Sequence, residues 1–298
     1  MGDIPDIEFI IFDKGKGRGA YADVRSQLQG RQFDVALCMH ASMRVNRIYR
    51  MIDSPLRLGY DRKRARDFQW LFTNERIAAT PEQHVLDGMM SFARHIGVPQ
   101  RELRWDIPLT PANQTFAEEA VGNGPALVIS PCSTQRLRNF RNWSAENYAA
   151  AANHARNKYG CRIILTGGPS ELEKDYARKI TDLCGAETVN LVGRTSLKEL
   201  LAVLAAADAL ISPDSGPAHM ATAAGTPVIG LYATSNPARS GPYLSQALTV
   251  NAYPEAVGRF LGKTPDQLRW GQRVRDPGAM DLIRLRDVNS KIDLVFGK

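Results

Sequence analysis

The strongest constraint on the fold is a regular alternation of short apolar runs with helical segments in the second half of the chain. The apolar runs have the length of strands and lie at 126–130, 162–166, 188–192, 209–212 and 227–231. The helical segments lie at 144–158, 170–183, 196–206 and 217–224. Strands that alternate with helices in this way form a parallel sheet with helices on both faces. We therefore expect an α/β domain over residues 126–275, with ligands at the carboxyl ends of its strands.

The first half of the chain shows the same alternation in a less regular form. Apolar runs at 7–12, 33–39 and 56–60 predict strands, and helices are predicted over 21–28, 43–52 and 81–96. Residues 109–125 carry prolines and glycines with little periodicity, which is typical of a linker. The sequence therefore predicts a first domain over 1–125 that ends in this linker. A C-terminal helix within 276–298 is expected to pack back on the body.

Composition restricts the cellular setting. The chain has 298 residues, of which 44% are hydrophobic and 23% charged, as in folded water-soluble proteins. No apolar run approaches the ~20 residues that a membrane span needs, and the N-terminus does not resemble a signal peptide. The scattered cysteines suit buried thiols better than disulfides or a metal site; they are Cys38, Cys132, Cys161 and Cys184. We therefore expect a soluble cytoplasmic protein without a bound metal.

Positive charge is concentrated in the first half of the chain. The formal net charge is +7, and the basic residues gather near 14–18, 44–50 and 57–66. Such clusters favour an anionic partner: a phosphorylated sugar, an anionic lipid or a nucleic acid. A merely solubilising surface is the alternative. Aromatic residues are not interleaved with the clusters as a base-stacking surface requires, so nucleic acid is not expected as a partner.

The segment 211–231 carries the sharpest motif. A buried strand ends at Asp214-Ser215-Gly216, and a helix begins at Pro217, a residue favoured in the first helical turn. Gly216 lets a ligand approach the backbone, and the amides that follow form an anion site. Asp214 would repel phosphate, so it suits a sugar hydroxyl or a role in fixing the loop, whereas His219 can reach a phosphate oxygen. The alternative is that Asp214 caps the helix and His219 lies on the surface.

This motif also carries a family resemblance. The pattern Asp-Ser-Gly-x-x-His-x-x-x-Ala-x-Gly-Thr-Pro-Val from Asp214, followed by residues 231–243, resembles that of glycosyltransferase family 9. The likeness extends to 130–134, 142–143, 166–171 and 191–197, and more weakly to 33–60. That family contains the ADP-heptose:lipopolysaccharide heptosyltransferases. The resemblance implies an α/β GT-B fold of two Rossmann-like domains, the N-terminal one shortened, with the donor nucleotide on the second.

The resemblance implies inverting transfer of a heptose from ADP-heptose to the lipopolysaccharide inner core or a related bacterial surface glycan, without a metal or cofactor. By position, Ser133 and Thr134 would bind the diphosphate and Arg141 would neutralise the leaving phosphate. Glu171 would hold nucleoside hydroxyls and Thr195 would line the base. The donor set is completed by Asp214, Ser215, Gly216 and His219. Taken singly, each residue also has an ordinary structural role as an alternative.

The acceptor side is less complete in this comparison. Basic residues that meet a phosphorylated, lipid-linked acceptor are expected at Lys14, Lys16 and Arg18, together with Arg44 or Arg47, with peripheral contact to the inner face of the inner membrane. Family members begin with a strand, a loop and a helix before the segment that resembles 7–12, and this sequence starts after them. That loop carries the aspartate that deprotonates the acceptor in inverting members. The catalytic residue therefore stays unassigned, and Asp13 is only a weak substitute.

Three explanations of this short N-terminus compete: a longer natural form, a natural short form with a rearranged acceptor domain, and a donor-binding relic without turnover. We favour the first. Two other functions stay open. One is a non-catalytic protein that binds a nucleotide sugar, and the other is a GT-B transferase or epimerase that uses a UDP-sugar.

Overall fold

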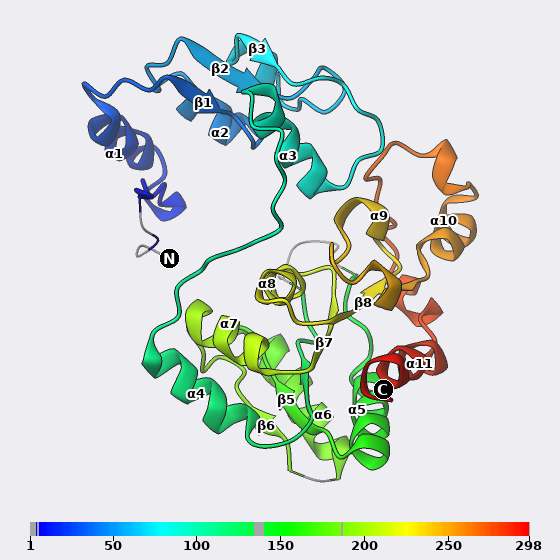
Figure 1. Ribbon diagram of the computed structural model, residues 1–298. Coiled ribbons are helices and arrows are strands. Elements are labelled where there is room, and N and C mark those ends of the chain that lie inside the picture. Colours follow the sequence, from blue (N-terminus) through cyan, green and yellow to red (C-terminus); the bar gives the residue numbers. More distant parts are fainter. Residues whose placement is uncertain (1–3, 5, 134–139, 186, 298) are drawn as a thin grey trace. The chain divides into compact units, whose positions relative to one another are not determined.

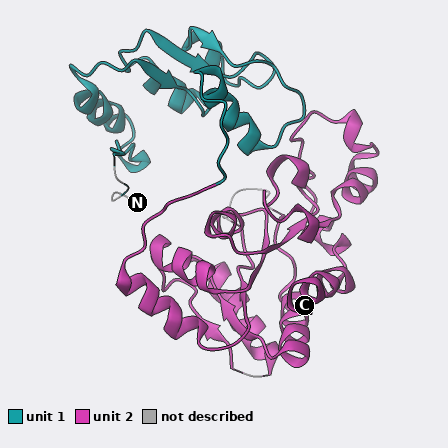
Figure 2. Ribbon diagram, viewed as in Figure 1, with its two compact units in different colours: residues 1–103 teal, residues 104–298 magenta. Residues whose placement is uncertain are grey.

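The chain forms two compact units, which are described separately. The computed structural model describes residues 4, 6–133, 140–185 and 187–297. The first unit spans residues 1–103 and the second spans residues 104–298 (Figure 2). Both contain parallel strands joined by helices.

The second unit is built on a six-stranded parallel sheet (Figure 1). Its strands are β4 (Ala126–Ile129), β5 (Arg162–Leu165), β6 (Val189–Asn190), β7 (Ala209–Pro213), β8 (Val228–Tyr232) and β9 (Val250–Asn251). They lie in the order β6-β5-β4-β7-β8-β9. Numbered within this unit, the order is 3-2-1-4-5-6, which is that of the Rossmann fold. The order in which successive strands are added reverses between β4 and β7. There Leu127 pairs with Ala209 and Ile129 with Ile211.

Helices cover both faces of this sheet, as the continuous apolar runs predict. They are α4 (Pro111–Val121), α5 (Ala145–Tyr159), α6 (Glu171–Cys184), α7 (Leu197–Ala206), α8 (Gly216–Ala224), α9 (Pro237–Ser240), α10 (Tyr253–Leu261) and α11 (Leu285–Phe296). Successive residues of β4 alternate between two buried clusters. Leu127 and Ile129 belong to a cluster with residues of α5, α6 and α11, whereas Ala126 and Val128 pack with α4, α7 and α8. Burial on both faces therefore explains why the strands show no polar alternation.

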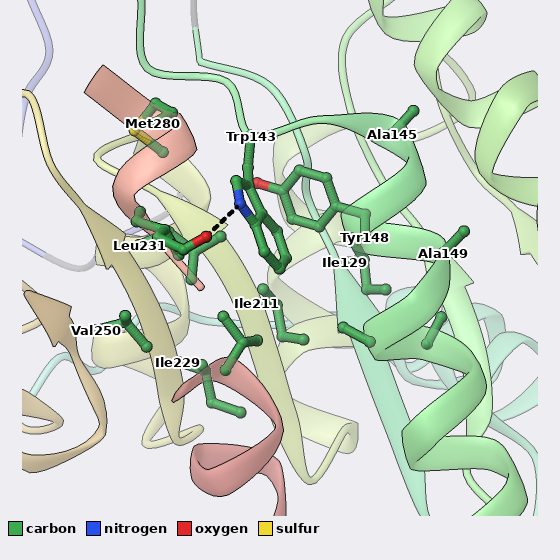
Figure 3. Close-up of a cluster of buried hydrophobic side chains, with 14 of the residues drawn as sticks. Ile129, Trp143, Ala145, Tyr148, Ala149, Ile211, Ile229, Leu231, Val250 and Met280 are labelled. Carbon is green, nitrogen blue, oxygen red and sulfur yellow. Dashed lines mark hydrogen bonds between the residues drawn. The ribbon is translucent and has the colours of Figure 1, made fainter. Parts of the chain in front are cut away.

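Local sequence sets the ends of the predicted helices in this unit. Ser144 accepts a hydrogen bond from the Asn147 amide and caps α5. Ser196 and Glu199 form a complete capping box at the start of α7, as the spacing predicts. Trp143 precedes α5 and is fully buried beside Tyr148, at 5.3 Å between ring centroids (Figure 3). Its indole N–H donates to the carbonyl of Ile283 at 3.1 Å and so ties the start of α5 to the C-terminal segment.

The segment 109–125, interpreted from the sequence as a linker, is mostly a helix. Thr110 and Asn113 form a capping box, Pro111 occupies the first turn, and Gly122 ends α4 with a positive φ of 69°. Ala117 and Ala120 of this helix pack into the cluster shared with α7 and α8. The linker interpretation is therefore wrong, and the boundary between the units falls at Leu103–Arg104. Small alanines make the buried face of α4 inconspicuous, so the apolar periodicity is weak.

The first unit has a three-stranded parallel sheet in the order β1-β2-β3. The strands are β1 (Val35–Leu37), β2 (Leu56–Gly59) and β3 (Glu75–Arg76), and the helices are α1 (Gly19–Leu28), α2 (Met43–Tyr49) and α3 (Val85–His95). Its buried clusters are small; one gathers Ala36, Cys38, Tyr49 and Phe72, the other Leu58, Ile77 and Phe92. The predicted helices and the strands at 33–39 and 56–60 are confirmed; α1 begins two residues earlier than predicted, and the other elements have shorter bounds.

The predicted strand at 7–12 is not formed. Residues 7–13 belong to no strand or helix, and the exposed fractions of Ile7, Phe9 and Ile11 are 52%, 46% and 76%. A strand requires a neighbour for its backbone hydrogen bonds, and this segment is paired with none of the strands in the described sheet. Apolar β-branched composition alone therefore did not decide the structure here.

The C-terminal segment packs on the second unit, in agreement with the sequence prediction. A 3₁₀ turn, Ala279–Leu282, precedes α11, and Val288 and Ile292 of α11 are fully buried with residues of α5. No helix in the described part of the chain is both long and apolar enough to cross a membrane.

Candidate functional site

The candidate site lies in the second unit at the point where the strand order reverses. The carboxyl ends of β4 and β7 are neighbours there, because Ile129 pairs with Ile211 and the Ser130 amide donates to the Ile211 carbonyl at 3.0 Å. Ligands of open parallel sheets bind outside the strand ends at such a reversal. The segments that follow β4, β7 and β8 therefore supply the candidate side chains.

Asp214 follows β7 and is the centre of a polar network. Only 6% of the residue is exposed. Its Oδ2 accepts a hydrogen bond from Ser235 Oγ at 2.9 Å and one from Arg141 Nη1 at 3.3 Å. Arg141 Nη1 also donates to the Asp214 carbonyl at 2.7 Å, and Arg273 Nη2 lies 3.8 Å from Oδ2. Asp214 therefore fixes this loop and holds arginines, one of the two roles that the sequence left open.

The start of α8 forms an open helix end beside this network. The helix begins at Gly216 with Pro217 in the first turn, and the Ser215 side chain makes no capping hydrogen bond. Ser215 Oγ instead lies 2.7 Å from Ser212 Oγ. Among the described residues, a side chain at Gly216 would meet nothing within 4 Å, so the backbone at the start of the helix is open on that side. These amides have no partner within the helix and suit an anion.

The loop after β4 is held by a residue to which the sequence analysis gave no role. The Ser133 amide donates to Asn142 Oδ1 at 2.9 Å, and Ser133 Oγ lies 3.3 Å from the same oxygen. Thr134, predicted beside Ser133 in the donor site, lies outside the described residues. Burial raises the pKa of the neighbouring Cys132 to about 12, so this thiol stays protonated at neutral pH. All four cysteines are buried and free, as predicted.

The loop after β5 uses the half-buried Glu173 as its acceptor, not the predicted Glu171. Glu173 accepts hydrogen bonds from the Gly168 amide at 2.8 Å and from Ser170 Oγ at 2.6 Å. The Glu171 side chain is 90% exposed and pairs with Lys174 at 2.8 Å. The hydrogen bond from Lys174 lowers the pKa of Glu171, so its carboxylate is ionised and accessible. Its predicted contact with nucleoside hydroxyls stays a prediction.

The remaining donor residues lie on nearby loops and at a helix start. Thr195 is half-buried between β6 and α7. The Gly193 amide of that segment donates to the Gly167 carbonyl at 2.9 Å and so joins the loops after β5 and β6. His219 is exposed on α8, within one turn of Gly216. The structure thus brings Ser133, Arg141, Asp214 and the start of α8 to the strand ends, whereas Glu171 is on the surface.

Two residues of the network were missed in the sequence analysis. Ser235 follows β8 and lies inside the motif segment 231–243. A polar residue just after a buried strand was a signal for a site residue, and it was not used. Arg273 lies in an irregular segment beyond α10, and no local pattern marks it. Only the folding of that segment against β8 brings Arg273 to Asp214.

The predicted acceptor residues lie in the first unit and are only partly gathered. Arg18 and Arg47 line a pocket of about 650 Å³ with Tyr21, Arg25, Arg50, Met51 and Phe72. Lys14 and Arg44 are not among its lining residues, and Lys16 is paired with Asp23 at 2.7 Å. Within the described residues, no carboxylate forms an ion pair with any of the four arginines of this pocket. The pocket therefore carries uncompensated positive charge.

Comparison with known proteins agrees with this geometry. The model of glycosyltransferase family 9 (heptosyltransferase) matches residues 21–259. The chain is 37% identical, over 289 residues, to the lipopolysaccharide core heptosyltransferase OpsX of Haemophilus influenzae. The aligned residues cover 97% of this chain and 82% of that protein. The chain belongs to glycosyltransferase family 9. The family resemblance of the motifs is thereby confirmed.

Solved structures share the fold of this family 9 chain. A family 9 glycosyltransferase from Veillonella parvula has a TM-score of 0.75 at 19% identity, covering 99% of this chain and 84% of that one. The Escherichia coli ADP-heptose lipopolysaccharide heptosyltransferase II has a TM-score of 0.67 at 17% identity, covering 98% and 84%. The predicted α/β fold of GT-B type is confirmed.

Proposed function

We propose that this chain transfers a heptose from ADP-heptose to the lipopolysaccharide inner core or a related bacterial surface glycan, with inversion at the anomeric carbon. Family membership supports glycosyl transfer, and the name of the Haemophilus influenzae relative supports a heptose donor and a lipopolysaccharide core acceptor. The observation that carries the proposal is the cationic group at the strand reversal. Arg141 is anchored on Asp214 there, next to the open end of α8.

This arrangement suits the departure of a nucleoside diphosphate. Negative charge grows on the diphosphate as the glycosidic bond to the donor sugar breaks. The first amides of α8 and the Arg141 guanidinium would stabilise that charge, because both are fixed before the reaction begins. Arg141 is fixed by its bond to the Asp214 carbonyl, and the Arg141 side chain is only 13% exposed. The proposal leaves unassigned the group that deprotonates the acceptor hydroxyl.

The residues of the proposed donor site fall into groups that would contact different parts of the donor. Ser133, Ser215, Gly216 and His219 surround the strand ends, and we propose that they contact the diphosphate with Arg141. Glu171, at the start of α6, and Thr195, in the loop after β6, remain proposed contacts of the nucleoside. Arg141 and Ser235 both donate to Asp214 Oδ2. We therefore propose that Asp214 contacts a sugar hydroxyl only through its other carboxylate oxygen, Oδ1.

Titration calorimetry of the whole chain tests the donor assignment. ADP-heptose, ADP and a UDP-sugar are titrated in turn, and we expect selective binding of the adenine ligands. Arg141→Gln should weaken ADP by about tenfold or more, since a charge-assisted hydrogen bond is lost. Lys198→Gln on α7 is the control. Preference for the UDP-sugar would instead support the alternative of a UDP-sugar enzyme, and absence of ADP binding would exclude the heptosyltransferase proposal.

A transfer assay separates catalysis from binding. With ADP-heptose and a phosphorylated inner-core acceptor, we expect release of ADP together with a heptosylated product. Tight binding of ADP-heptose without transfer to a correct acceptor would favour the alternative of a non-catalytic nucleotide-sugar-binding protein.

We also propose that the first unit binds the phosphates of a lipid-linked acceptor. The proposed residues are Lys14, Lys16, Arg18, Arg44 and Arg47, and the unpaired arginines of the pocket support this role most directly for Arg18 and Arg47. The variant Arg18→Ala/Arg47→Ala should lose affinity for a phosphorylated acceptor but not for its dephosphorylated form. Arg94→Ala on α3 is the control. Binding to anionic but not neutral vesicles, reduced in the same variant, would test peripheral membrane contact.

A further inference from the structure

We propose that Arg273 supplies a second guanidinium for the donor diphosphate, and that Asp214 positions it together with Arg141. The inference rests on the proposed function, because it assumes a nucleoside diphosphate at the strand reversal. It goes beyond the family motif, since Arg273 lies outside the matched residues 21–259.

The backbone around Arg273 is fixed on both sides. The preceding carbonyl, of Gln272, accepts a hydrogen bond from the Tyr253 hydroxyl at 2.8 Å. The following amide, of Val274, donates to the Thr234 carbonyl at 3.0 Å, and Val274 is 2% exposed. Thr234 lies two residues beyond the end of β8. The segment is therefore attached to the carboxyl end of the sheet, and Arg273 is not on a freely moving tail.

The Arg273 side chain forms an ion pair with Asp214 but donates no hydrogen bond to the Asp214 carboxylate. Nη2 lies 3.8 Å from Asp214 Oδ2, within the range of an ion pair but beyond a hydrogen bond. The Arg273 side chain is 43% exposed, whereas that of Asp214 is 8% exposed. The guanidinium is thus attracted to the buried carboxylate while its N–H groups stay available to a ligand from solvent.

Charge balance explains why this geometry suits a diphosphate. Two guanidinium groups share one carboxylate, so the network carries a net charge of one positive unit beside the open, positive end of α8. Without Asp214 the arginines would repel each other. With Asp214 present, both arginines are held next to the same carboxylate oxygen, Oδ2. A planar guanidinium group binds two phosphate oxygens at once. Asp214 is therefore a positioning residue, and Arg273 is the proposed ligand-binding one.

The test is the affinity of the whole chain for ADP and for adenosine, measured by calorimetry. Arg273→Gln should weaken ADP by about tenfold and leave adenosine unchanged, because only ADP carries the diphosphate. Arg273→Lys should recover part of the loss. Arg275→Gln is the matched control, because Arg275 is exposed two residues further along the same segment. A wild-type affinity for ADP in Arg273→Gln would overturn the proposal while leaving the proposed function intact.

Further outcomes separate the remaining possibilities. Equal losses of ADP and adenosine binding would show that Arg273 acts through the fold, which also overturns the proposal. Failure of the wild-type chain to bind ADP would overturn the proposed function and this inference with it. The positioning role of Asp214 predicts that Arg273→Gln has a smaller effect in an Asp214→Asn background. Strictly additive effects would overturn that role.

Discussion

At the scale of single residues, Thr166 has a buried hydroxyl that no group in the described part of the chain satisfies. It follows β5, is fully buried, and its Oγ1 has no hydrogen-bond partner among the described residues. An unsatisfied buried hydroxyl keeps its desolvation cost. Thr166→Val should therefore raise the free energy of unfolding by about 1 kcal/mol. Urea denaturation monitored by circular dichroism measures the change.

A second threonine provides the matched comparison. Thr226 is 5% exposed, and its Oγ1 donates to the Leu204 carbonyl at 2.6 Å. The same replacement, Thr226→Val, removes a satisfied hydrogen bond and should lower the free energy of unfolding by about 1 kcal/mol. If both variants were destabilised equally, the Thr166 hydroxyl would have a partner and the first prediction would be wrong.

At the scale of elements, Asp293 fastens α11 to α5. Its Oδ1 lies 2.6 Å from His154 Nε2 and 2.9 Å from the Tyr159 hydroxyl, and Lys158 Nζ is 3.1 Å from Oδ2. Burial raises the pKa of Asp293, but these hydrogen bonds outweigh it and lower the pKa to about 2. Asp293→Asn should therefore destabilise the protein at neutral pH, by about 1 kcal/mol because solvent screens this partly exposed side chain.

The pH dependence of that loss follows from the direction of the shift. An unfolded aspartate has a pKa of about 3.9, so the ionised, bonded carboxylate stabilises the fold fully above about pH 4. The stabilisation fades as the pH falls toward 2, where the folded-state group takes up its proton. Unfolding of wild type and Asp293→Asn should converge over this range. Asp287→Asn, at a half-exposed position on the same helix, should show no such convergence.

The predictability of elements depended on how their buried faces are composed. Strands β4, β5, β7 and β8 were predictable because they are buried on both faces and carry unbroken apolar runs. Helix α4 was not, because alanines form much of its buried face and prolines and glycines flank it. The run at 7–12 has strand composition but no partner in the described sheet. Whether a strand forms thus depends on a neighbour, which local sequence does not encode.

At the scale of the molecule, the candidate site combines segments that are far apart in the chain. Motif order placed Ser133, Arg141 and the Asp214–Gly216 turn correctly at the strand ends, since the strand order brings β4 and β7 together. It could not indicate that Asp214 is shared by Arg141 and Arg273. That contact joins positions separated by more than fifty residues and depends on Val274 pairing with Thr234. Side-chain partners of this kind follow from packing, not from local pattern.

The two units should also differ in stability. The second unit has extensive buried clusters on both faces of its sheet, whereas those of the first unit are small. Hydrophobic stabilisation grows with buried apolar area, so we expect urea to unfold the first unit at a lower concentration. Of the four tryptophans, Trp70 lies in the first unit, whereas Trp105, the buried Trp143 and Trp270 lie in the second. The fluorescence of Trp70 therefore reports the first transition, and that of the other three reports the second.

Ligand linkage distinguishes independent units from a single cooperative one. ADP that binds the second unit stabilises that unit by mass action, by about 2.7 kcal/mol at a hundred times its Kd. ADP should therefore shift the transition of the second unit and leave that of the first unit, reported by Trp70, in place. The Trp70→Phe variant identifies the transition of the first unit, because that fluorescence change is lost in it. A single transition that ADP moves as a whole would show that the units unfold together. In that case the small clusters of the first unit would have to gain their stability from the second.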